Sequence, residues 1–416
     1  MGVFQLYILD FKEKIAIEFI SIRKYLFQMK VAILGIDGYI GWALAMRLAR
    51  NGKEVIGLDS QYTRQRVSEV GSESLLPIAS MEERTKIFEE KTGKNIEFYR
   101  GDVNDPDFVI DFVKRNRPDA FVHLAEQRSA PYSMIGLKQA RETLIQNMGG
   151  TINLVYAMKE FTPDAHLLKL GTMGEYGTPN TDIPEGFFEI EYNGRKDTFP
   201  FPKFAGSWYH WSKVHDTNNL MFANRVWGLK ITDVMQGVVY GTKTKEIEEY
   251  GLNTRFDFDE VWGTALNRFC VQASVGIPLT AYGKGDQRRG YLSLEDSISC
   301  LELGLDKPPK SGEYRVYNQF DEHYSINELT GLVKERGEKL FNYEIKVDHL
   351  DNPRVEKDQH YYNPEHRKLK ELGFKPSKNL NDDIDVILKD VKLYDKIALE
   401  HKNVILPKTV WNKSRI

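Results

Sequence analysis

The sequence has 416 residues, of which 41% are hydrophobic and 28% are charged, and its formal net charge is -3. This length allows two lobes with sizeable cores. The composition excludes a disordered chain and a protein that coats nucleic acid through a basic surface. The two cysteines, Cys270 and Cys300, stand in no CxxC or Cys/His pattern. They indicate neither a disulfide framework nor a metal site, and they fit a reducing cytoplasm.

Residues 1–28 begin with an apolar run that Asp10, Glu13 and Glu18 interrupt. A secretory or membrane segment does not tolerate this charge spacing, and transit peptides are poor in acidic residues. We therefore expect an N-terminal extension, either an amphipathic helix or an extended start, and no membrane partner.

A short apolar run over residues 30–34 predicts a buried parallel strand, and a glycine turn follows it directly. In this turn Gly35 permits a tight bend, Gly38 lets the backbone approach a diphosphate, and Gly41 allows a helix to pack closely on the sheet. The positive end of that helix favours a diphosphate.

Helical spacing over residues 42–50 and an apolar run over residues 54–58 complete a βαβ unit of dinucleotide-binding length. The second strand ends in Asp59. Its carboxylate is expected to accept hydrogen bonds from the adenosine ribose and to repel a 2′-phosphate, which predicts NAD as the cofactor. Arg64 and Arg66 nearby leave NADP open.

Further strands are predicted at residues 96–99, 120–122 and 166–170, with helical stretches between them. This alternation predicts an α/β protein with a Rossmann-type, doubly wound parallel sheet. Two long connections, residues 62–95 and 178–206, are predicted to be functional lids.

The chemistry is expected near the end of the 166–170 strand, where Thr172 follows, and at the start of a later helix that carries Tyr209 and Lys213. The spacing of four puts Tyr209 and Lys213 on one helix face, so that the ammonium group can favour the phenolate. Thr172 can hold a sugar hydroxyl while Tyr209 removes its proton. We expect residues 29–240 to form the NAD-binding domain and residues 241–416 to form mainly a smaller substrate lobe.

Five longer stretches resemble the UDP-sulfoquinovose synthase family: residues 126–134, 169–180, 236–241, 263–272 and 352–356. The likeness runs from about Lys30 to at least Leu372. It implies an enzyme that binds NAD and UDP-glucose, adds sulfite to the sugar and releases UDP-6-sulfo-quinovose. It implies no metal.

The resemblance also implies which residues bind each ligand. Besides the glycine turn, Asp59, Tyr209 and Lys213, the implied cofactor residues are Tyr39, Ile40, Ser60, Arg64, Asp102, Val103, Arg128, Asn147 and Val239. The implied substrate residues are Arg128, Thr172, Gln236, Arg268, Arg289, Arg354 and Glu356. Arginines are expected because sulfite and diphosphate bring negative charge into a partly desolvated cleft.

Oxidation of the sugar at C4 would make the C5 hydrogen acidic, so that the 6-hydroxyl can be eliminated, sulfite can add to C6 and hydride can return to C4. Related sugar dehydratases have Thr-Asp-Glu where this chain has Thr172-Met173-Gly174. The missing acids argue against an ordinary dehydratase and leave the C5 base unassigned. Glu175 and His210 are the candidates.

Two other interpretations remain open. An NAD-dependent UDP-hexose 4-epimerase or dehydratase would share the glycine turn, Asp59, Thr172, Tyr209 and Lys213. A protein that only senses NAD could keep the cofactor site without chemistry, although the intact Thr172, Tyr209 and Lys213 set argues against it. A homodimer that pairs through the tyrosine helix is expected from the resemblance.

Overall fold

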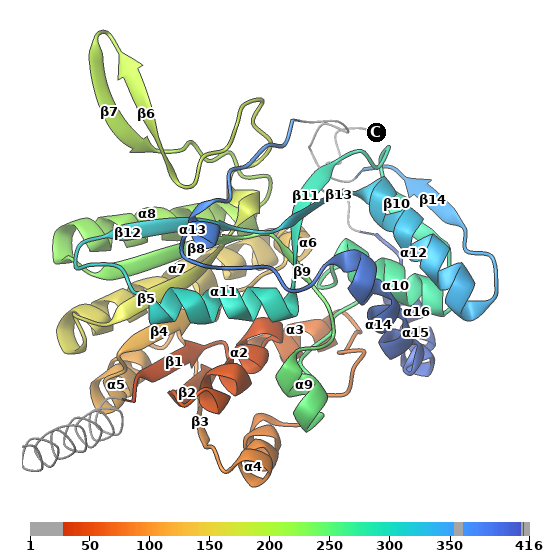
Figure 1. The fold of residues 1–416 in the computed structure, drawn as a ribbon, viewed down its shortest axis with the longest axis horizontal. Coiled ribbons are helices and arrows are strands. Elements are labelled where there is room, and N and C mark those ends of the chain that lie inside the picture. Colours follow the sequence, from red (N-terminus) through yellow and green to blue (C-terminus); the bar gives the residue numbers. More distant parts are fainter. Residues whose placement is uncertain (1–27, 353–360, 409–410, 412–416) are drawn as a thin grey trace, which may run out of the picture.

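The computed structural model describes residues 28–352, 361–408 and 411, and a seven-stranded parallel sheet forms its centre (Figure 1). In spatial order the strands are β12 (Tyr314–Gln319), β8 (Lys230–Gln236), β5 (His166–Thr172), β4 (Ala120–His123), β1 (Lys30–Leu34), β2 (Glu54–Asp59) and β3 (Ile96–Arg100). This is the order of a Rossmann-type sheet, so the predicted fold class is confirmed.

Helices cover both faces of the sheet because successive strand residues point to opposite sides. One face carries α2 (Tyr39–Arg50) and α11 (Leu294–Asp306), and the other carries α5 (Pro106–Asn116), α7 (Leu137–Phe161) and α8 (Trp208–Trp227). Along β1, Val31 and Ile33 pack into the first layer, whereas Ala32 and Leu34 pack into the second. All four are buried, which explains the continuous apolar run in the sequence.

A smaller lobe with its own apolar core lies beside the sheet. Its strands are β9 (Val238–Tyr240), β10 (Leu279–Tyr282), β11 (Arg288–Ser293), β13 (Glu322–Ser325) and β14 (Val347–Leu350). Its helices are α10 (Ala265–Ser274), α12 (Ile326–Phe341), α14 (Leu380–Lys392), α15 (Asp395–Glu400) and α16 (Lys402–Ile405). Helix α9 (Lys245–Tyr250) packs against α2 in the core of the central sheet instead. Helix α11 and strand β12 also come from beyond residue 240, but they belong to the layers of the central sheet.

The two long connections contain secondary structure of their own, which the sequence analysis did not predict. Residues 62–95 contain α3 (Tyr62–Glu69) and α4 (Met81–Thr92), while residues 178–206 contain the antiparallel pair β6 (Phe187–Tyr192) and β7 (Arg195–Pro200). This hairpin projects from the body of the molecule (Figure 1). The remaining short helices are α6 (Ala130–Ser133), η1 (Met173–Glu175) and α13 (Lys368–Glu371).

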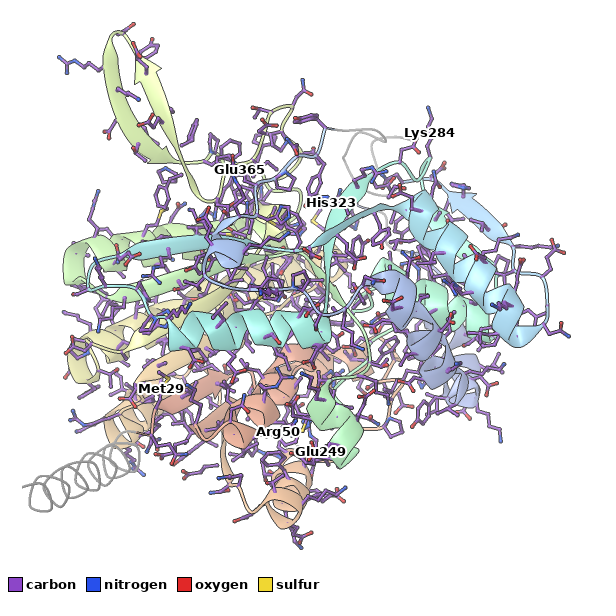
Figure 2. The ribbon with its side chains drawn as sticks, viewed as in Figure 1. Met29, Arg50, Glu249, Lys284, His323 and Glu365 are labelled. Atoms are coloured by element: carbon purple, nitrogen blue, oxygen red, sulfur yellow. The ribbon has the colours of Figure 1, made fainter. Side chains whose placement is uncertain are left out.

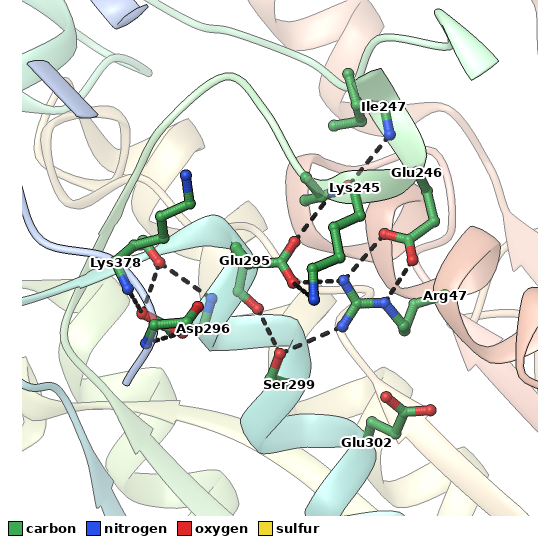
Figure 3. A network of polar contacts seen from close by, with 12 residues as sticks. Arg47, Lys245, Glu246, Ile247, Glu295, Asp296, Ser299, Glu302 and Lys378 are labelled. Carbon is green, nitrogen blue, oxygen red and sulfur yellow. Dashed lines mark hydrogen bonds and ion pairs between the residues drawn. The ribbon is translucent and has the colours of Figure 1, made fainter. Parts of the chain in front are cut away.

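A buried polar network joins α2 to α9 and α11 (Figure 3). Arg47 on α2 forms ion pairs with Glu246 at 2.6 Å and with Glu295 at 2.7 Å. Arg50, one turn further along α2, pairs with Glu249 at the surface of α9 (Figure 2). The network therefore fixes the glycine-turn helix against elements from the second half of the chain.

Within the part of the chain that the structure describes, no helix combines the length and the apolar content needed to cross a membrane. The expected N-terminal extension falls, apart from residue 28, outside the described residues.

Candidate functional site

A cavity of about 910 Å³ lies at the carboxyl ends of the sheet strands, where ligands bind in open α/β sheets. Residues that follow β1, β2, β4 and β5 line one side of it. Residues of the second lobe, from Arg255 to Tyr291, line the other side. One cavity therefore joins the predicted cofactor residues to the predicted catalytic residues.

The glycine turn has the geometry that a dinucleotide diphosphate requires. Gly35 has a φ of +91°, and a Cβ added there would lie 2.7 Å from the carbonyl carbon of Leu124. A Cβ on Gly41 would lie 2.2 Å from the Gly35 carbonyl oxygen. Gly38 forms the N-cap of α2 and lines the cavity, and no side chain caps the helix there. The first amides of α2 therefore fit an anion.

Asp59 ends β2 and lines the cavity beside Ser60. Its carboxylate accepts hydrogen bonds from the backbone N–H groups of Asp37 at 2.9 Å and of Gln61 at 2.6 Å. Burial, and then the charge of Asp37, raise the pKa of Asp59 to about 6. The group is thus ionised at neutral pH and oriented to accept ribose hydroxyls.

Arg64 and Arg66, which could have bound the 2′-phosphate of NADP, already form ion pairs with acidic side chains. Arg64 donates to the Asp37 carboxylate at 2.6 and 2.7 Å, and the buried Arg84 binds the same carboxylate. Arg66 pairs with Glu142. Arg64 lies outside the cavity wall, so its predicted contact with the cofactor is not direct in this structure.

The other predicted cofactor residues fall into two groups. Those that line the cavity are Tyr39, Ile40, Asp102, Val103, Arg128 and Val239. Asn147 is fully buried behind the wall, where its side chain accepts from the N–H of Gln127 at 2.7 Å and donates to Ser212 Oγ at 2.8 Å. It connects the loop after β4 to α8 and positions that loop.

The predicted catalytic residues meet at one end of the cavity. Thr172 ends β5, and Tyr209, His210 and Lys213 lie in the first two turns of α8. Ser207, the N-cap of α8, accepts from the N–H of His210 at 3.2 Å and lies 2.9 Å from His210 Nδ1. The cap therefore fixes both the helix start and the imidazole orientation.

The Lys213 ammonium group binds a partner that the sequence analysis did not name. It donates to the Leu170 carbonyl oxygen at 2.7 Å and to the carboxylate of Glu126, and it lies 5.9 Å from the centre of the Tyr209 ring. Burial alone would raise the pKa of Glu126, but Lys213 and Lys169 keep it well below its usual value. Lys213 thus interacts more directly with Glu126 than with Tyr209.

The structure separates the two candidates for the C5 base. Glu175 is fully buried outside the cavity wall, and its carboxylate accepts from the Thr172 N–H at 3.2 Å and from Lys203. The His210 imidazole lines the cavity over Gly174, where an added Cβ would lie 2.4 Å from Nε2. Only a glycine at position 174 leaves room for this imidazole.

Five of the predicted substrate residues line the cavity: Arg128, Thr172, Gln236, Arg268 and Arg289. Arg128 binds the carboxylate of Asp257 and donates to the Trp262 carbonyl oxygen at 3.0 Å. This holds its guanidinium beside the cavity. Arg354 and Glu356 lie outside the described residues.

Sequence reasoning missed three residues of this site. Asp37 lies within the glycine turn, and Glu126 lies in the loop after β4 at the carboxyl end of the sheet. These positions were a signal that the sequence offered for both residues. Tyr362 lines the cavity and accepts from the Gly290 N–H at 3.2 Å. It comes from a segment without periodicity and had no comparable signal.

Comparisons with known proteins identify the family of this chain. Residues 31–318 match the model of the NAD dependent epimerase/dehydratase family. The chain is 52% identical over 386 residues to UDP-sulfoquinovose synthase of Sulfolobus acidocaldarius, covering 92% of this chain and 98% of the relative. It is 48% identical over 385 residues to the chloroplastic UDP-sulfoquinovose synthase of Spinacia oleracea, covering 92% and 79%.

Solved structures share the fold. UDP-glucose 4-epimerase of Thermotoga maritima, solved with UDP-glucose, has a TM-score of 0.66 at 20% identity and covers 89% of this chain and 100% of that chain. UDP-glucuronic acid 4-epimerase of Bacillus cereus, solved with UDP-glucuronic acid and NAD, has a TM-score of 0.66 at 19% identity and covers 88% and 99%. The chain therefore belongs to the NAD dependent epimerase/dehydratase family and, within it, to the UDP-sulfoquinovose synthases.

Proposed function

We propose that this chain converts UDP-glucose and sulfite to UDP-6-sulfo-quinovose in the cavity described above. One observation carries the proposal: the same cavity contains the glycine turn, Asp59, Thr172, Tyr209 and His210. The two relatives that are 52% and 48% identical to this chain, both named UDP-sulfoquinovose synthases, support the proposal.

The cofactor is NAD, which when bound supplies the acceptor and later the donor of the C4 hydride. The amide groups at the start of α2, around Gly38, would hold its diphosphate. Asp59 would accept its adenosine ribose hydroxyls, and its own carboxylate disfavours a 2′-phosphate at the same place.

Thr172 and Tyr209 act on the 4-hydroxyl of the sugar. Thr172 holds the hydroxyl, and the Tyr209 phenolate takes its proton as the C4–H bond breaks and the ketone forms. When hydride returns to C4 at the end of the cycle, Tyr209 gives the proton back to O4. These two residues therefore complete the first and last steps without net proton exchange.

His210 acts on the 4-keto sugar. It removes the C5 proton and passes it to the 6-hydroxyl, so that the C6–O bond breaks and water leaves. The sulfur of hydrogen sulfite then bonds to C6 of the alkene, and its proton goes to C5. The proposal assigns the proton transfer to His210 because Met173 and Gly174 have no acidic group and Glu175 points away from the cavity.

The exposed apolar side chains of two adjacent helices support a homodimer. They are Ile145, Ile152 and Tyr156 on α7 and Phe222 and Val226 on α8, each at least 38% exposed. Pairing of the two helices with those of a second copy would bury them as a four-helix bundle. Replacing Ile145 and Phe222 by Asp should then give monomers in light scattering. Dimers that persist would contradict this interface.

The proposal also places the reaction in the cytoplasm, because Cys270 and Cys300 are both buried as free thiols.

The test incubates the purified protein with UDP-glucose, with and without sulfite, and follows the nucleotide sugars by mass spectrometry. The proposed function predicts a sulfonated UDP-sugar only when sulfite is present. UDP-galactose formed without sulfite would indicate an epimerase, and unchanged UDP-glucose in both samples would indicate a protein that binds without catalysis.

A further inference from the structure

A cluster of charged side chains lies beneath the catalytic tyrosine. Its members are Glu126, Lys169, Glu175, Lys203, Lys213, Asp216 and Asp233. Each is buried or nearly so, and together they comprise four carboxyl groups and three ammonium groups. If all were ionised, the cluster would have a net negative charge in a region that water cannot stabilise. One bound proton would make it neutral.

The hydrogen bonds identify the carboxyl group that holds this proton. Glu126 accepts from Lys213, Glu175 accepts from Lys203, and Asp233 accepts from the Thr217 hydroxyl at 2.7 Å. A buried carboxylate without donors is disfavoured as an anion. Asp216 is such a group, because no ammonium, hydroxyl or amide group of the described residues donates to its oxygens. Its side chain is hydrogen-bonded to the Glu126 carboxylate, an arrangement that requires a proton on one of the two and so favours a neutral Asp216.

The electrostatic surroundings of Asp216 agree with this assignment. Burial, and then the charge of Glu126, raise the pKa of Asp216 well above its usual value, while Lys169 and Lys213 act in the opposite direction. Glu126 therefore remains the anion that binds Lys213, next to a neutral Asp216.

Glu126 also acts on the tyrosine itself. The charged and titratable groups around the Tyr209 hydroxyl come from the loop after β4, from β5, from η1 and from α8: Glu126, Arg128, Lys169, Glu175, His210 and Lys213. After burial, Glu126 contributes most to raising the pKa of Tyr209. It therefore opposes the ammonium that is expected to favour the phenolate.

We propose that Glu126 is a positioning residue of the reaction. It holds the Lys213 ammonium between its own carboxylate and the Leu170 carbonyl oxygen, so that Lys213 stays in place while the charge on Tyr209 changes. Asp216 is the neutral member that allows Glu126 to remain an anion. The inference rests on the proposed function.

The test measures how the first reduction of bound NAD by UDP-glucose depends on pH, without sulfite, in the wild-type protein and in Glu126→Gln. Removing the carboxylate removes a negative charge near Tyr209 and releases Lys213, so the acidic limb of the profile should move to lower pH by about one unit or more. Binding of UDP-glucose, measured by calorimetry, should stay within about threefold of wild type, because Glu126 does not act on the sugar.

Asp216→Asn is the matched control, since an amide has the size of a neutral carboxyl group. Its pH limb should coincide with that of wild type. As a measurement independent of turnover, the infrared spectrum of the wild-type protein should contain a band of a protonated carboxyl group that Asp216→Asn lacks.

An acidic limb that stays in place in Glu126→Gln would overturn the role of Glu126. If that variant does not fold, Glu126→Asp is tested instead, because its shorter side chain keeps the charge but withdraws it from Lys213. A slower reaction with an unmoved acidic limb would support the proposal. A wild-type rate would overturn it. Absence of the infrared band would overturn the neutral Asp216. A wild-type protein that does not reduce NAD with UDP-glucose contradicts the proposed function instead.

Discussion

Tyr209 lies in surroundings that disfavour its phenolate, since burial and the carboxylates of Glu126 and Glu175 raise its pKa while Lys169 and Arg128 lower it. The initial oxidation at C4 should therefore become faster as the pH rises above neutrality, because a larger fraction of Tyr209 is ionised.

Tyr209→Phe keeps the ring but removes the ionisable hydroxyl. Loss of a general base typically lowers the rate about 10²–10⁴-fold, and UDP-glucose affinity should change little. Stopped-flow absorbance of NADH and calorimetry of UDP-glucose binding measure the two effects. An active Phe variant would remove Tyr209 from the mechanism.

His210 and Glu175 are distinguished by hydrogen exchange at C5. With UDP-glucose in deuterated water, His210→Ala should still form bound NADH and a 4-keto sugar, but it should slow incorporation of deuterium at C5 by about 10²-fold or more. Glu175→Gln should retain exchange, because its carboxylate lies behind Thr172, outside the cavity wall. Exchange at the wild-type rate in His210→Ala would exclude His210 as the base.

Asp59 makes cofactor affinity depend on pH. Its pKa is raised to about 6, so protonation below this pH removes the acceptor for the ribose hydroxyls. Affinity for NAD should weaken as the pH falls from about 8 to about 5, and this dependence should be absent in Asp59→Asn. Calorimetry of NAD binding to cofactor-free protein measures it. Tight NADP binding by the wild type would contradict the assigned role.

At the scale of single residues, the sequence predicted which side chains lie in the site better than it predicted the residues that they bind. The spacing of Tyr209 and Lys213 predicted a shared helix face, and both do lie at the start of α8. It could not predict that Lys213 binds Glu126, because the two residues are 87 positions apart and meet only after β4 and α8 have packed.

At the scale of elements, the buried network around Arg47 fixes α2 against α9 and α11 (Figure 3). Burial opposes ionisation of Glu246, but its bond to Arg47 keeps the pKa below the usual value. A carboxyl group with a lowered pKa in the folded state stabilises the protein above the pKa of the unfolded chain, and this contribution is lost as the pH falls through the folded-state pKa.

Glu246→Gln should therefore lower the free energy of unfolding by about 2 kcal/mol at neutral pH, because the buried Arg47 loses one of its two carboxylate partners and keeps only Glu295. The difference from wild type should shrink below about pH 4. Glu249→Gln, which alters an exposed pair with Arg50, is the matched control and should change stability by less than about 1 kcal/mol. Urea unfolding at several pH values measures both, and equal effects would contradict the account.

Regular elements were predictable where apolar residues repeat with a clear period. The strands at residues 96–99 and 120–122 were predicted within one residue of β3 and β4. The β6–β7 hairpin was missed although Asn193 and Gly194 both adopt positive φ at its turn, as the Asn-Gly pair of a type I′ hairpin does. Its strands are largely exposed, so they lack the burial that makes a strand pattern readable.

At the scale of the whole molecule, the site is built from segments that are far apart in the sequence. Gly38 and Tyr209 line one side of the cavity, whereas Arg268, Gln287 and Tyr291 line the other. The glycine turn and Tyr209 could be predicted from local patterns. The cavity residues of the second lobe could be predicted only from the resemblance to a known family, because they form no motif that implies a ligand.

The central claim is that oxidation, sulfite addition and reduction occur in this one cavity without release of the hydrogen taken from C4. The most direct test uses UDP-glucose deuterated at C4, together with sulfite and an excess of free NAD. The account predicts UDP-6-sulfo-quinovose that retains deuterium at C4, with no label in free NADH. Product that has lost the label to solvent or to free NADH, or the absence of a sulfonated product, would contradict the account.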